Sequence, residues 1–187
     1  MNSIITMTLP RTYEERISGL LADLGIPATY GRDRHMPLCP EADELASVGA
    51  DVYGREQFLA PHAAAAWRAL QAAALDGGLT LLLVSAFRSV AYQQNIIQGK
   101  LRDGQPLDDV LRVNAAPGYS EHHTGRAVDL TTPGCPPLTE GFDRLVAFAW
   151  LTAHAADFGF LMTYPRGNPQ SMIYEPWHWL WVEKKPL

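Results

Sequence analysis

Three short strand-like segments follow one another closely in the last third of the sequence, and this spacing limits the folds open to the chain. Segments 160–164 and 171–174 flank a turn that contains Pro165 and Pro169, and the aromatic-rich segment 177–182 comes directly afterwards. Helices and strands do not alternate regularly along the rest of the chain. The pattern predicts an α+β fold in which helices flank a small, largely antiparallel sheet.

Earlier segments show two kinds of apolar pattern. Apolar residues at helical spacing predict helices over residues 11–24, 62–75, 90–102 and 142–158. Short apolar runs predict buried strands over residues 79–84 and 126–130. Residues 27–57 are irregular in pattern and rich in proline and glycine, and residues 103–120 are expected to form a loop with at most one helical turn. We therefore expect an N-terminal helical and irregular arm, residues 1–60, packed on a core of residues 61–187.

The composition argues against two classes of partner. The chain has 187 residues, with 15 Lys and Arg against 20 Asp and Glu, and a formal net charge of −5. Nucleic-acid-binding proteins need a clustered basic face, so no nucleic-acid partner is expected. No apolar run approaches the roughly 18 residues of a membrane-spanning helix. Cys39 and Cys135 are expected to be free thiols, with one disulfide between their loops as the alternative.

The first residues do not match a secretory signal peptide. Residues 4–9 form a short apolar patch that contains Thr6 and Thr8, no basic residue precedes it, and Pro10 ends it. A signal peptide has a basic start, a longer apolar run and a cleavage site of small residues. We therefore expect a cytoplasmic protein, or a periplasmic or released one if an export segment precedes this sequence.

Two histidines and one aspartate are candidates for the ligands of a single metal ion. His122 and Asp129 would lie about 10 Å apart along a straight helix, which is too far to share an ion. A turn at Gly125 would let the chain fold back so that both reach the same metal. Imidazole nitrogen and carboxylate oxygen are good zinc ligands, and His178 is the candidate for the third. The sequence therefore predicts one Zn²⁺ per chain.

Glu175 and Arg88 are candidates for the catalytic groups beside that metal. A catalytic zinc site keeps three protein ligands and leaves a position for water, whose pKa falls toward 7. Glu175 lies three residues before His178, and Pro176 bends the segment so that both can face the site and the carboxylate can take the proton of the water. Arg88 follows an apolar strand and opens a helix, where its guanidinium can polarise a scissile carbonyl or hold a substrate carboxylate.

Each of these residues also has a purely structural interpretation. His122 and His123 can be exposed loop residues, or His123 can replace His122 as the ligand, and Asp129 can cap a turn. His178 can be a buried histidine between two tryptophans, and Arg88 can form an ion pair at the start of a helix. Only the combination of these residues, in this order, is specific.

The three blocks resemble those of the zinc D-alanyl-D-alanine carboxypeptidases of the VanY and VanX type. The family pattern Ser-x-His-x3-Gly-x-Ala-x-Asp is matched from Ser120 to Asp129, and the pattern Glu-x-x-His is matched by Glu175 and His178. A third block, Ser-Gly-Tyr-Arg-Ser-x3-Gln, is matched over residues 85–93 except that Ala and Phe replace Gly and Tyr. The same superfamily holds lysostaphin-like peptidases and the hedgehog signalling domain.

The resemblance, which covers residues 79–183, assigns a fold and a role to each residue of the site. It implies a hedgehog-like or D-Ala-D-Ala-peptidase-like fold and a zinc peptidase domain over residues 61–187. It implies that zinc is bound by His122, Asp129 and His178, with Glu175 as general base and then as acid for the leaving amine. The substrate contacts that it implies are made by Arg88, Gln93, Ser120 and Tyr164.

The resemblance further implies a zinc-dependent carboxypeptidase that hydrolyses the terminal D-Ala of peptidoglycan stem peptides or precursors. An L,D-carboxypeptidase or a lysin-like cell-wall endopeptidase on the same fold is the alternative among enzymes. Pocket depth, which the motifs do not show, decides between cleavage at the end of a peptide and cleavage within it. A non-catalytic domain with a structural zinc is the alternative outside enzymes. The presence of both Glu175 and Arg88 argues against that last alternative.

Overall fold

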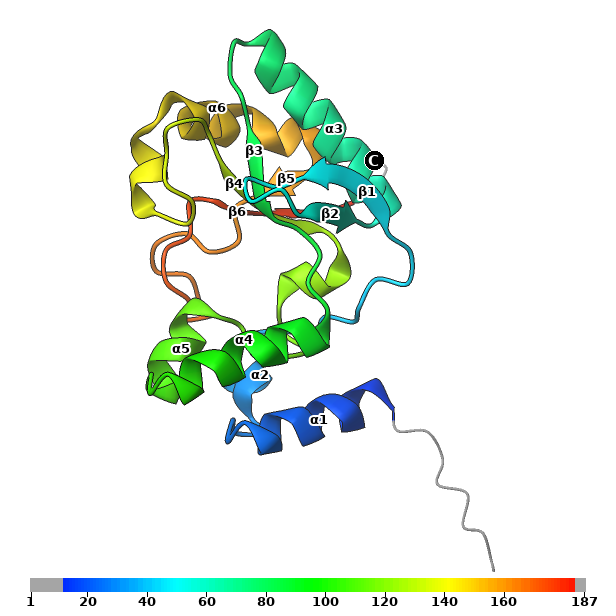
Figure 1. Ribbon diagram of the computed structural model, residues 1–187, viewed down its shortest axis with the longest axis vertical. Helices are drawn as coiled ribbons and strands as arrows, with labels where there is room; N and C mark the ends of the chain where they lie inside the picture. Colours follow the sequence, from blue (N-terminus) through cyan, green and yellow to red (C-terminus); the bar gives the residue numbers. More distant parts are fainter. Residues whose placement is uncertain (1–11, 184–187) are drawn as a thin grey trace, which may run out of the picture.

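A small antiparallel sheet lies at the centre of the upper half of the molecule (Figure 1). The computed structural model describes residues 12–183. Within them, a four-stranded sheet has the order β3-β4-β6-β5, and each neighbouring pair is antiparallel. Its strands are β3 (Leu82–Ser85), β4 (Ala127–Thr131), β5 (Phe160–Leu161) and β6 (His178–Trp181). The predicted α+β fold with a small antiparallel sheet is confirmed.

The helices form two groups, one beside the sheet and one below it (Figure 1). The upper group, beside the sheet, consists of α3 (Pro61–Asp76) and α6 (Val146–His154). The lower group consists of α1 (Tyr13–Asp23), α2 (Tyr30–Asp33), α4 (Val90–Arg102) and α5 (Leu107–Val113). Each group has its own apolar core. One contains Trp67, Leu130 and Phe160, and the other contains Ile17 and Ile97.

Local sequence explains where the helices begin. The Thr12 hydroxyl accepts a hydrogen bond from the backbone N–H of Glu15, whose carboxylate accepts one from the N–H of Thr12, and this capping box begins α1. Pro61 occupies the first turn of α3, where its missing N–H costs nothing. Ser89 caps α4, and its hydroxyl accepts a hydrogen bond from the N–H of Tyr92. The helices predicted over residues 62–75 and 90–102 are confirmed.

The segment predicted to be irregular, residues 27–57, contains regular structure. Besides α2, it contributes strand β1 (Ala46–Ala50), which pairs with β2 (Glu56–Leu59) in an antiparallel hairpin. The carboxylate of Asp51 closes the turn by accepting hydrogen bonds from backbone N–H groups of Tyr53 and Arg55. The prediction was wrong here because the strands are short and are stabilised by tertiary contacts. One such contact is the hydrogen bond from the N–H of Val52 to the carbonyl of Leu83 on β3.

Four further elements differ from the prediction. The helix expected over residues 142–158 is interrupted at Leu145, which has extended dihedral angles (φ −96°, ψ 153°), so that two 3₁₀ helices, η2 (Glu140–Arg144) and η3 (Ala155–Phe158), flank α6. Helix α5 has seven residues rather than one turn. Of the strands expected over 160–164 and 171–174, the first is shortened to β5 and the second is absent. In that segment the Asn168 side chain donates a hydrogen bond to the carbonyl of Met172 and accepts one from its N–H, and these bonds stabilise an irregular loop.

Several other predictions concern single features. Cys39 and Cys135 are free thiols, as expected. No helix in the described part of the chain is long and apolar enough to cross a membrane. The residues on which the signal-peptide prediction depends lie outside those that the structure describes. The division into an arm of residues 1–60 and a domain of residues 61–187 stays a prediction.

Candidate metal centre and active site

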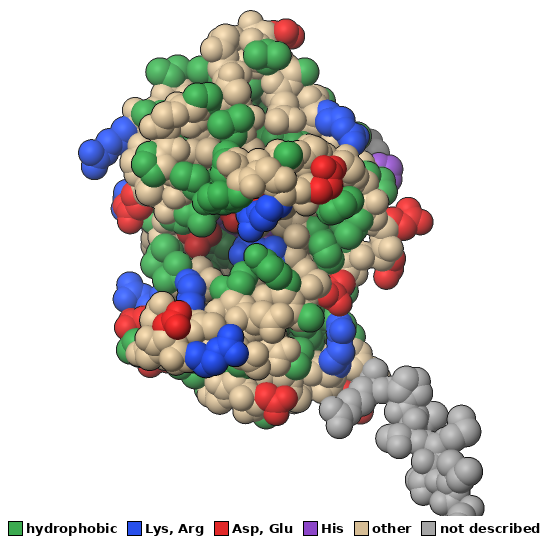
Figure 2. Space-filling model, viewed as in Figure 1, with side chains coloured by type: hydrophobic (Ala, Val, Ile, Leu, Met, Phe, Trp, Pro, Cys, Tyr) green, Lys and Arg blue, Asp and Glu red, His purple; other side chains and the backbone are tan. Residues whose placement is uncertain are grey.

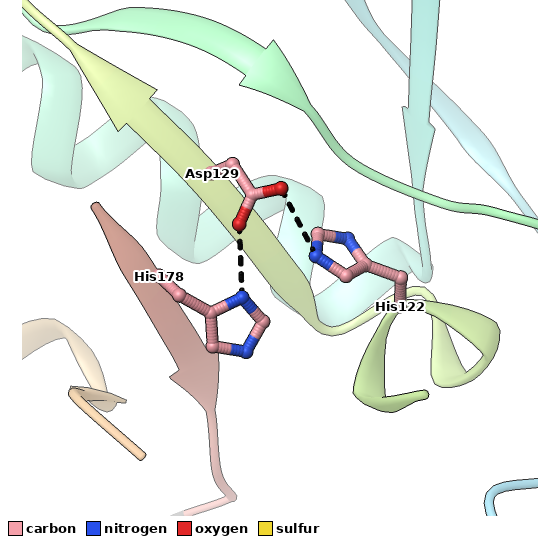
Figure 3. A group of neighbouring side chains, drawn as sticks. All are labelled: His122, Asp129 and His178. Atoms are coloured by element: carbon pink, nitrogen blue, oxygen red, sulfur yellow. Dashed lines mark hydrogen bonds and ion pairs between the residues drawn. The ribbon is translucent and has the colours of Figure 1, made fainter. Parts of the chain in front are cut away.

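Three buried side chains from separate elements point toward one another (Figure 3). His122 comes from the 3₁₀ helix η1 (Glu121–Thr124), Asp129 from β4 and His178 from β6. The ligand atoms that these residues offer all lie within 4.8 Å of one another. The structure therefore brings together the three residues that the sequence predicts as metal ligands.

Sheet register and one turn place these side chains. Asp129 and His178 are direct partners in the antiparallel pairing of β4 with β6, so their side chains lie on the same face of the sheet. Gly125 ends η1 with φ +64° and turns the chain back into β4. A Cβ atom at this position would lie 2.8 Å from the backbone nitrogen of Ala60. The predicted turn between His122 and Asp129 thus depends on glycine for both conformation and space.

The hydrogen bonds of His122 leave one ring nitrogen available to a metal. Nδ1 lies 2.6 Å from the carbonyl oxygen of Ala86, which can only accept, so Nδ1 carries the proton. Nε2 is buried, has no hydrogen-bond partner among the described residues, and lies 3.2 Å from Oδ2 of Asp129. Burial and then the nearby Arg88 lower the pKa of His122 to about 4, so the ring is neutral. A lone pair therefore faces a carboxylate oxygen, an arrangement that a cation between them would stabilise.

His178 lies between two carboxylates. Its Nε2 is 2.8 Å from Oε2 of Glu121, and its Nδ1 is 2.9 Å from Oδ1 of Asp129. Burial opposes a charged ring, but the hydrogen bonds to Asp129 and Glu121 outweigh it and raise the pKa of His178 to about 10. The ring of Tyr164 stacks on that of His178, with centroids 4.8 Å apart. The two carboxylates therefore favour a positive charge at His178, which either a proton or a metal ion can supply.

The donor set fits zinc. Two imidazole nitrogens and one carboxylate are a combination that zinc takes in catalytic sites, leaving a further position open. Although burial opposes ionisation, His122 and His178 hold the pKa of Asp129 well below its usual range, so it is an anionic group that can serve as a ligand. Nε2–H of His178 would donate to Glu121 and leave Nδ1 for the metal, which is the common arrangement of a metal-bound histidine.

His123 does not belong to this cluster. Its Nε2 accepts a hydrogen bond from the backbone N–H of Gly118 at 3.1 Å, so its Nδ1 carries the proton, which it donates to the carbonyl of Arg88 at 2.6 Å. Both ring nitrogens are occupied, and the alternative in which His123 replaces His122 does not hold. The side chain instead anchors the backbone of Arg88.

Glu175 lies beside the metal cluster in a small enclosed pocket of about 20 Å³. Its backbone N–H donates to the carbonyl of Tyr164, and its own carbonyl accepts from the N–H of His178, so the tight turn before β6 holds it in place. The side chain is buried, and this burial is the main cause that raises the pKa of Glu175 to about 7. A carboxyl group with such a pKa can exchange a proton near neutral pH.

The substrate-binding candidates line the same pocket. They are Arg88, Gln93, Ser120 and Tyr164. Arg88 Nη2 lies 3.8 Å from Oδ2 of Asp129, and its Nε is buried with no hydrogen-bond partner among the described residues. Gln93 donates from Nε2 to the carbonyl of Ala115 but leaves Oε1 buried and unpaired. Unpaired buried polar groups are rare, so these atoms at the pocket wall are candidates for ligand contacts.

A larger cleft of about 630 Å³ adjoins the metal cluster. Figure 2 shows a hollow between the two halves of the molecule, with basic side chains at its edge. The cleft is lined by Arg88 and Asp129, by the turn of the β1–β2 hairpin and by residues of α4 such as Tyr92 and Ile96. The site thus combines a small enclosed pocket with an open groove.

Glu121 is a site residue that sequence reasoning missed. Its carboxylate accepts from Nε2 of His178 and also from the hydroxyl of Thr163, at 2.7 Å. The hydrogen bonds from His178 and Thr163 hold its pKa below the usual value against the effect of burial. Its position directly before His122 was a signal that it lies near the metal, but the pairing with His178 spans 57 residues and no sequence spacing reveals it.

An antiparallel sheet that carries a buried His-Asp-His cluster beside a buried glutamate defines the class of metallopeptidases to which the sequence blocks also pointed. The chain belongs to the VanY family of D-alanyl-D-alanine carboxypeptidases, whose family model matches residues 56–184. The motif-based resemblance is thereby confirmed.

Similar proteins include one curated relative and two solved structures. The YodJ protein of Bacillus subtilis (strain 168) is 30% identical over 136 residues, which are 70% of this chain and 49% of YodJ, so the chain spans about half the length of that relative. The LdcB LD-carboxypeptidase structure is 28% identical with a TM-score of 0.69, covering 78% of this chain and 71% of that one. The structure of VanYB in complex with D-alanine-D-alanine is 25% identical with a TM-score of 0.60, covering 75% and 77%.

Proposed function

We propose that this chain is a zinc-dependent carboxypeptidase that hydrolyses the terminal D-Ala of peptidoglycan stem peptides or precursors. One observation carries the proposal: the ligand atoms of His122, Asp129 and His178 converge next to a pocket that contains Glu175. The family membership supports the reaction class. The proposed substrate is supported by the similarity of this chain to VanYB, whose structure is described in complex with D-alanine-D-alanine.

The protein side chains supply binding, orientation and proton transfer. When bound by His122, Asp129 and His178, Zn²⁺ supplies a Lewis acid that polarises a carbonyl and lowers the pKa of water. Glu175, deprotonated at its carboxylate, takes the proton of the attacking water and then gives it to the leaving amine. Arg88, whose guanidinium is only partly exposed, donates hydrogen bonds to the negative charge that develops on the scissile carbonyl or to the terminal carboxylate.

The two spaces of the site differ greatly in size. The pocket beside Glu175 has about 20 Å³ of space, which is room for about one water molecule. Its wall offers the unpaired Oε1 of Gln93 and the buried hydroxyl of Ser120. The open cleft of about 630 Å³ has space for the remainder of the peptide. Because little space continues on the Glu175 side of the site, this difference favours cleavage at the end of a chain over cleavage within a cross-linked network.

An L,D-carboxypeptidase is the second candidate. The observation that favours it is the LdcB structure, described as an LD-carboxypeptidase, which is similar to this chain over 78% of its length with a TM-score of 0.69. Both candidates use the same metal site and the same pocket. They differ in the configuration of the residue whose carbonyl is attacked.

The test compares four peptides with zinc-loaded protein: a pentapeptide stem ending in D-Ala-D-Ala, the same peptide as its C-terminal amide, the tetrapeptide stem and a cross-linked dimer. Release of D-Ala from the pentapeptide acid, with at least tenfold slower cleavage of the amide, is the expected result. Cleavage of the tetrapeptide alone would replace the proposal by the L,D-carboxypeptidase. Equal cleavage of the amide or the dimer would favour an endopeptidase. Zinc-dependent peptide binding without turnover would favour a non-catalytic domain.

A further inference from the structure

Arg55 presents a fixed cation to the open cleft. It lies in the turn of the β1–β2 hairpin, just before the residues that match the family model. Its side chain is 51% exposed and lines the same cleft as Arg88 and Asp129. Arg55 has no part in the metal cluster or the enclosed pocket. The proposed reaction therefore leaves its position in the cleft wall unexplained.

Three contacts hold the guanidinium of Arg55 in one orientation. Nε and Nη2 both lie 2.7 Å from Oδ2 of Asp51, and Nη2 also donates to the carbonyl oxygen of Val84 at 3.2 Å. The guanidinium carbon lies 4.9 Å from the centre of the exposed Tyr53 ring. Nη1 has no hydrogen-bond partner in the part of the chain that the structure describes. Two N–H groups of a pre-ordered side chain are therefore free to bind a ligand.

The buried carboxylate of Asp51 does not cancel this role. It is shared among several donors, since it also accepts from the side chain of Gln57 and from two backbone N–H groups of the turn. Glu56, an acidic residue in the same cleft wall, accepts a hydrogen bond from the hydroxyl of Ser47. A planar guanidinium whose other edge is anchored in this way is suited to recognise a carboxylate.

The sheet register places this cation close to the metal cluster. Ser85 on β3 is the direct partner of Asp129 on β4, and such partners have Cα atoms about 5 Å apart. Val84, whose carbonyl accepts the hydrogen bond from Arg55, precedes Ser85, and consecutive Cα atoms are about 3.8 Å apart. The anchor of Arg55 thus lies within roughly 9 Å of Asp129. Extended peptide advances about 3.3 Å per residue, so this distance corresponds to about three residues of substrate.

We propose that Arg55 binds a free carboxylate on the acyl part of the substrate, within about three residues N-terminal to the scissile bond. This inference rests on the proposed peptidase function and adds a preference for peptides that carry an acidic group at that place. The acyl part is assigned to the open cleft because this cleft reaches Asp129 and has about 630 Å³ of space, against about 20 Å³ in the pocket beside Glu175. Arg55 is a specificity-determining residue of this cleft and takes no part in bond cleavage.

The test measures kcat/KM for synthetic peptides that end in D-Ala-D-Ala and carry either Glu or Gln at the second or the third residue before the scissile bond. Wild-type protein should prefer the Glu peptide at one of these positions by roughly fivefold, the size expected of a half-exposed ion pair. Arg55→Gln should lower kcat/KM for the Glu peptide to that for the Gln peptide. Arg55→Lys should keep only part of the preference, because a point charge does not replace the planar fork.

Arg166→Gln is the matched control. Arg166 is also exposed, paired with carboxylates and stacked on a tyrosine, but it does not line the cleft, so its loss should leave the preference intact. Equal cleavage of the Glu and Gln peptides by the wild type would overturn the inference. So would an equal loss on both peptides in folded Arg55→Gln, which indicates a structural role. If that variant fails to fold, Arg55→Lys and the wild-type comparison decide. Absence of zinc-dependent cleavage of every peptide would instead overturn the proposed function.

Discussion

Replacing Glu121 by glutamine should weaken Zn²⁺ binding without removing a metal ligand. Glu121 accepts the hydrogen bond from Nε2 of His178 at 2.8 Å, and this bond orients the ring so that Nδ1 faces the metal position. The negative charge of Glu121 also makes the imidazole of His178 a stronger ligand, because it increases the electron density on Nδ1. Partners of this kind typically contribute about 10- to 100-fold to metal affinity.

The local structure narrows that range. A hydrogen bond to a charged group contributes about 1.5–3 kcal/mol, and about 1.4 kcal/mol corresponds to tenfold in affinity. The Glu121 side chain is 18% exposed, so solvent screens part of its charge. The glutamine amide of the Glu121→Gln variant would keep one carbonyl oxygen that can still accept from His178. We therefore expect a loss of about 1.5–2 kcal/mol, or roughly 10- to 30-fold in the dissociation constant of Zn²⁺.

The assay is competition for Zn²⁺ against a chelator of known affinity near neutral pH, with circular dichroism to confirm the fold. Glu140→Gln is the matched control, because Glu140 is an exposed glutamate that pairs with Arg166 away from the metal cluster. Thr163→Val, which removes the hydroxyl that also donates to Glu121, should give a smaller loss in the same direction. A folded Glu121→Gln protein with wild-type Zn²⁺ affinity would refute this account of His178.

Two other substitutions test the pocket and the turn. Arg88→Lys should lower kcat/KM for the free-acid peptide at least tenfold with unchanged zinc content, because the planar fork is lost; near-normal activity would remove Arg88 from substrate contact. Gly125→Ala should lower the melting temperature more than Gly167→Ala does, since both have positive φ but only the first new Cβ meets backbone, 2.8 Å from the nitrogen of Ala60. A cost above about 2 kcal/mol is expected for Gly125→Ala, and equal melting temperatures for the two variants would contradict it.

Sequence patterns predicted the elements whose causes are local. The capping box of α1, Pro61 at the start of α3 and the apolar runs of β3 and β4 all act within a few residues. The hairpin at residues 46–59 was missed because its stability comes from Asp51 and from hydrogen bonds to β3. The strand expected at residues 171–174 does not form. The Asn168 side chain makes hydrogen bonds with the N–H and the carbonyl of Met172, which would otherwise be free to pair with a neighbouring strand.

In the site, too, features with local causes could be predicted from the sequence and features with long-range causes could not. The proximity of the three candidate ligands could be predicted because they occur in motifs of fixed spacing, and Gly125 between His122 and Asp129 indicated the turn. The pairing of Glu121 with His178 and the placement of Arg55 in the cleft arise from strand register and from the hairpin. Those contacts join residues far apart in the sequence, so no local pattern carries them.

Zinc content and turnover, measured together on two variants, test the central claim most directly. Glu175→Ala should keep one Zn²⁺ per chain and the wild-type fold but lose about 10²- to 10⁴-fold in kcat, because it removes only the proton carrier. His178→Ala should lose both zinc and activity, because it removes a ligand. Full zinc occupancy in His178→Ala, or near-normal kcat in Glu175→Ala, would contradict the account of this site.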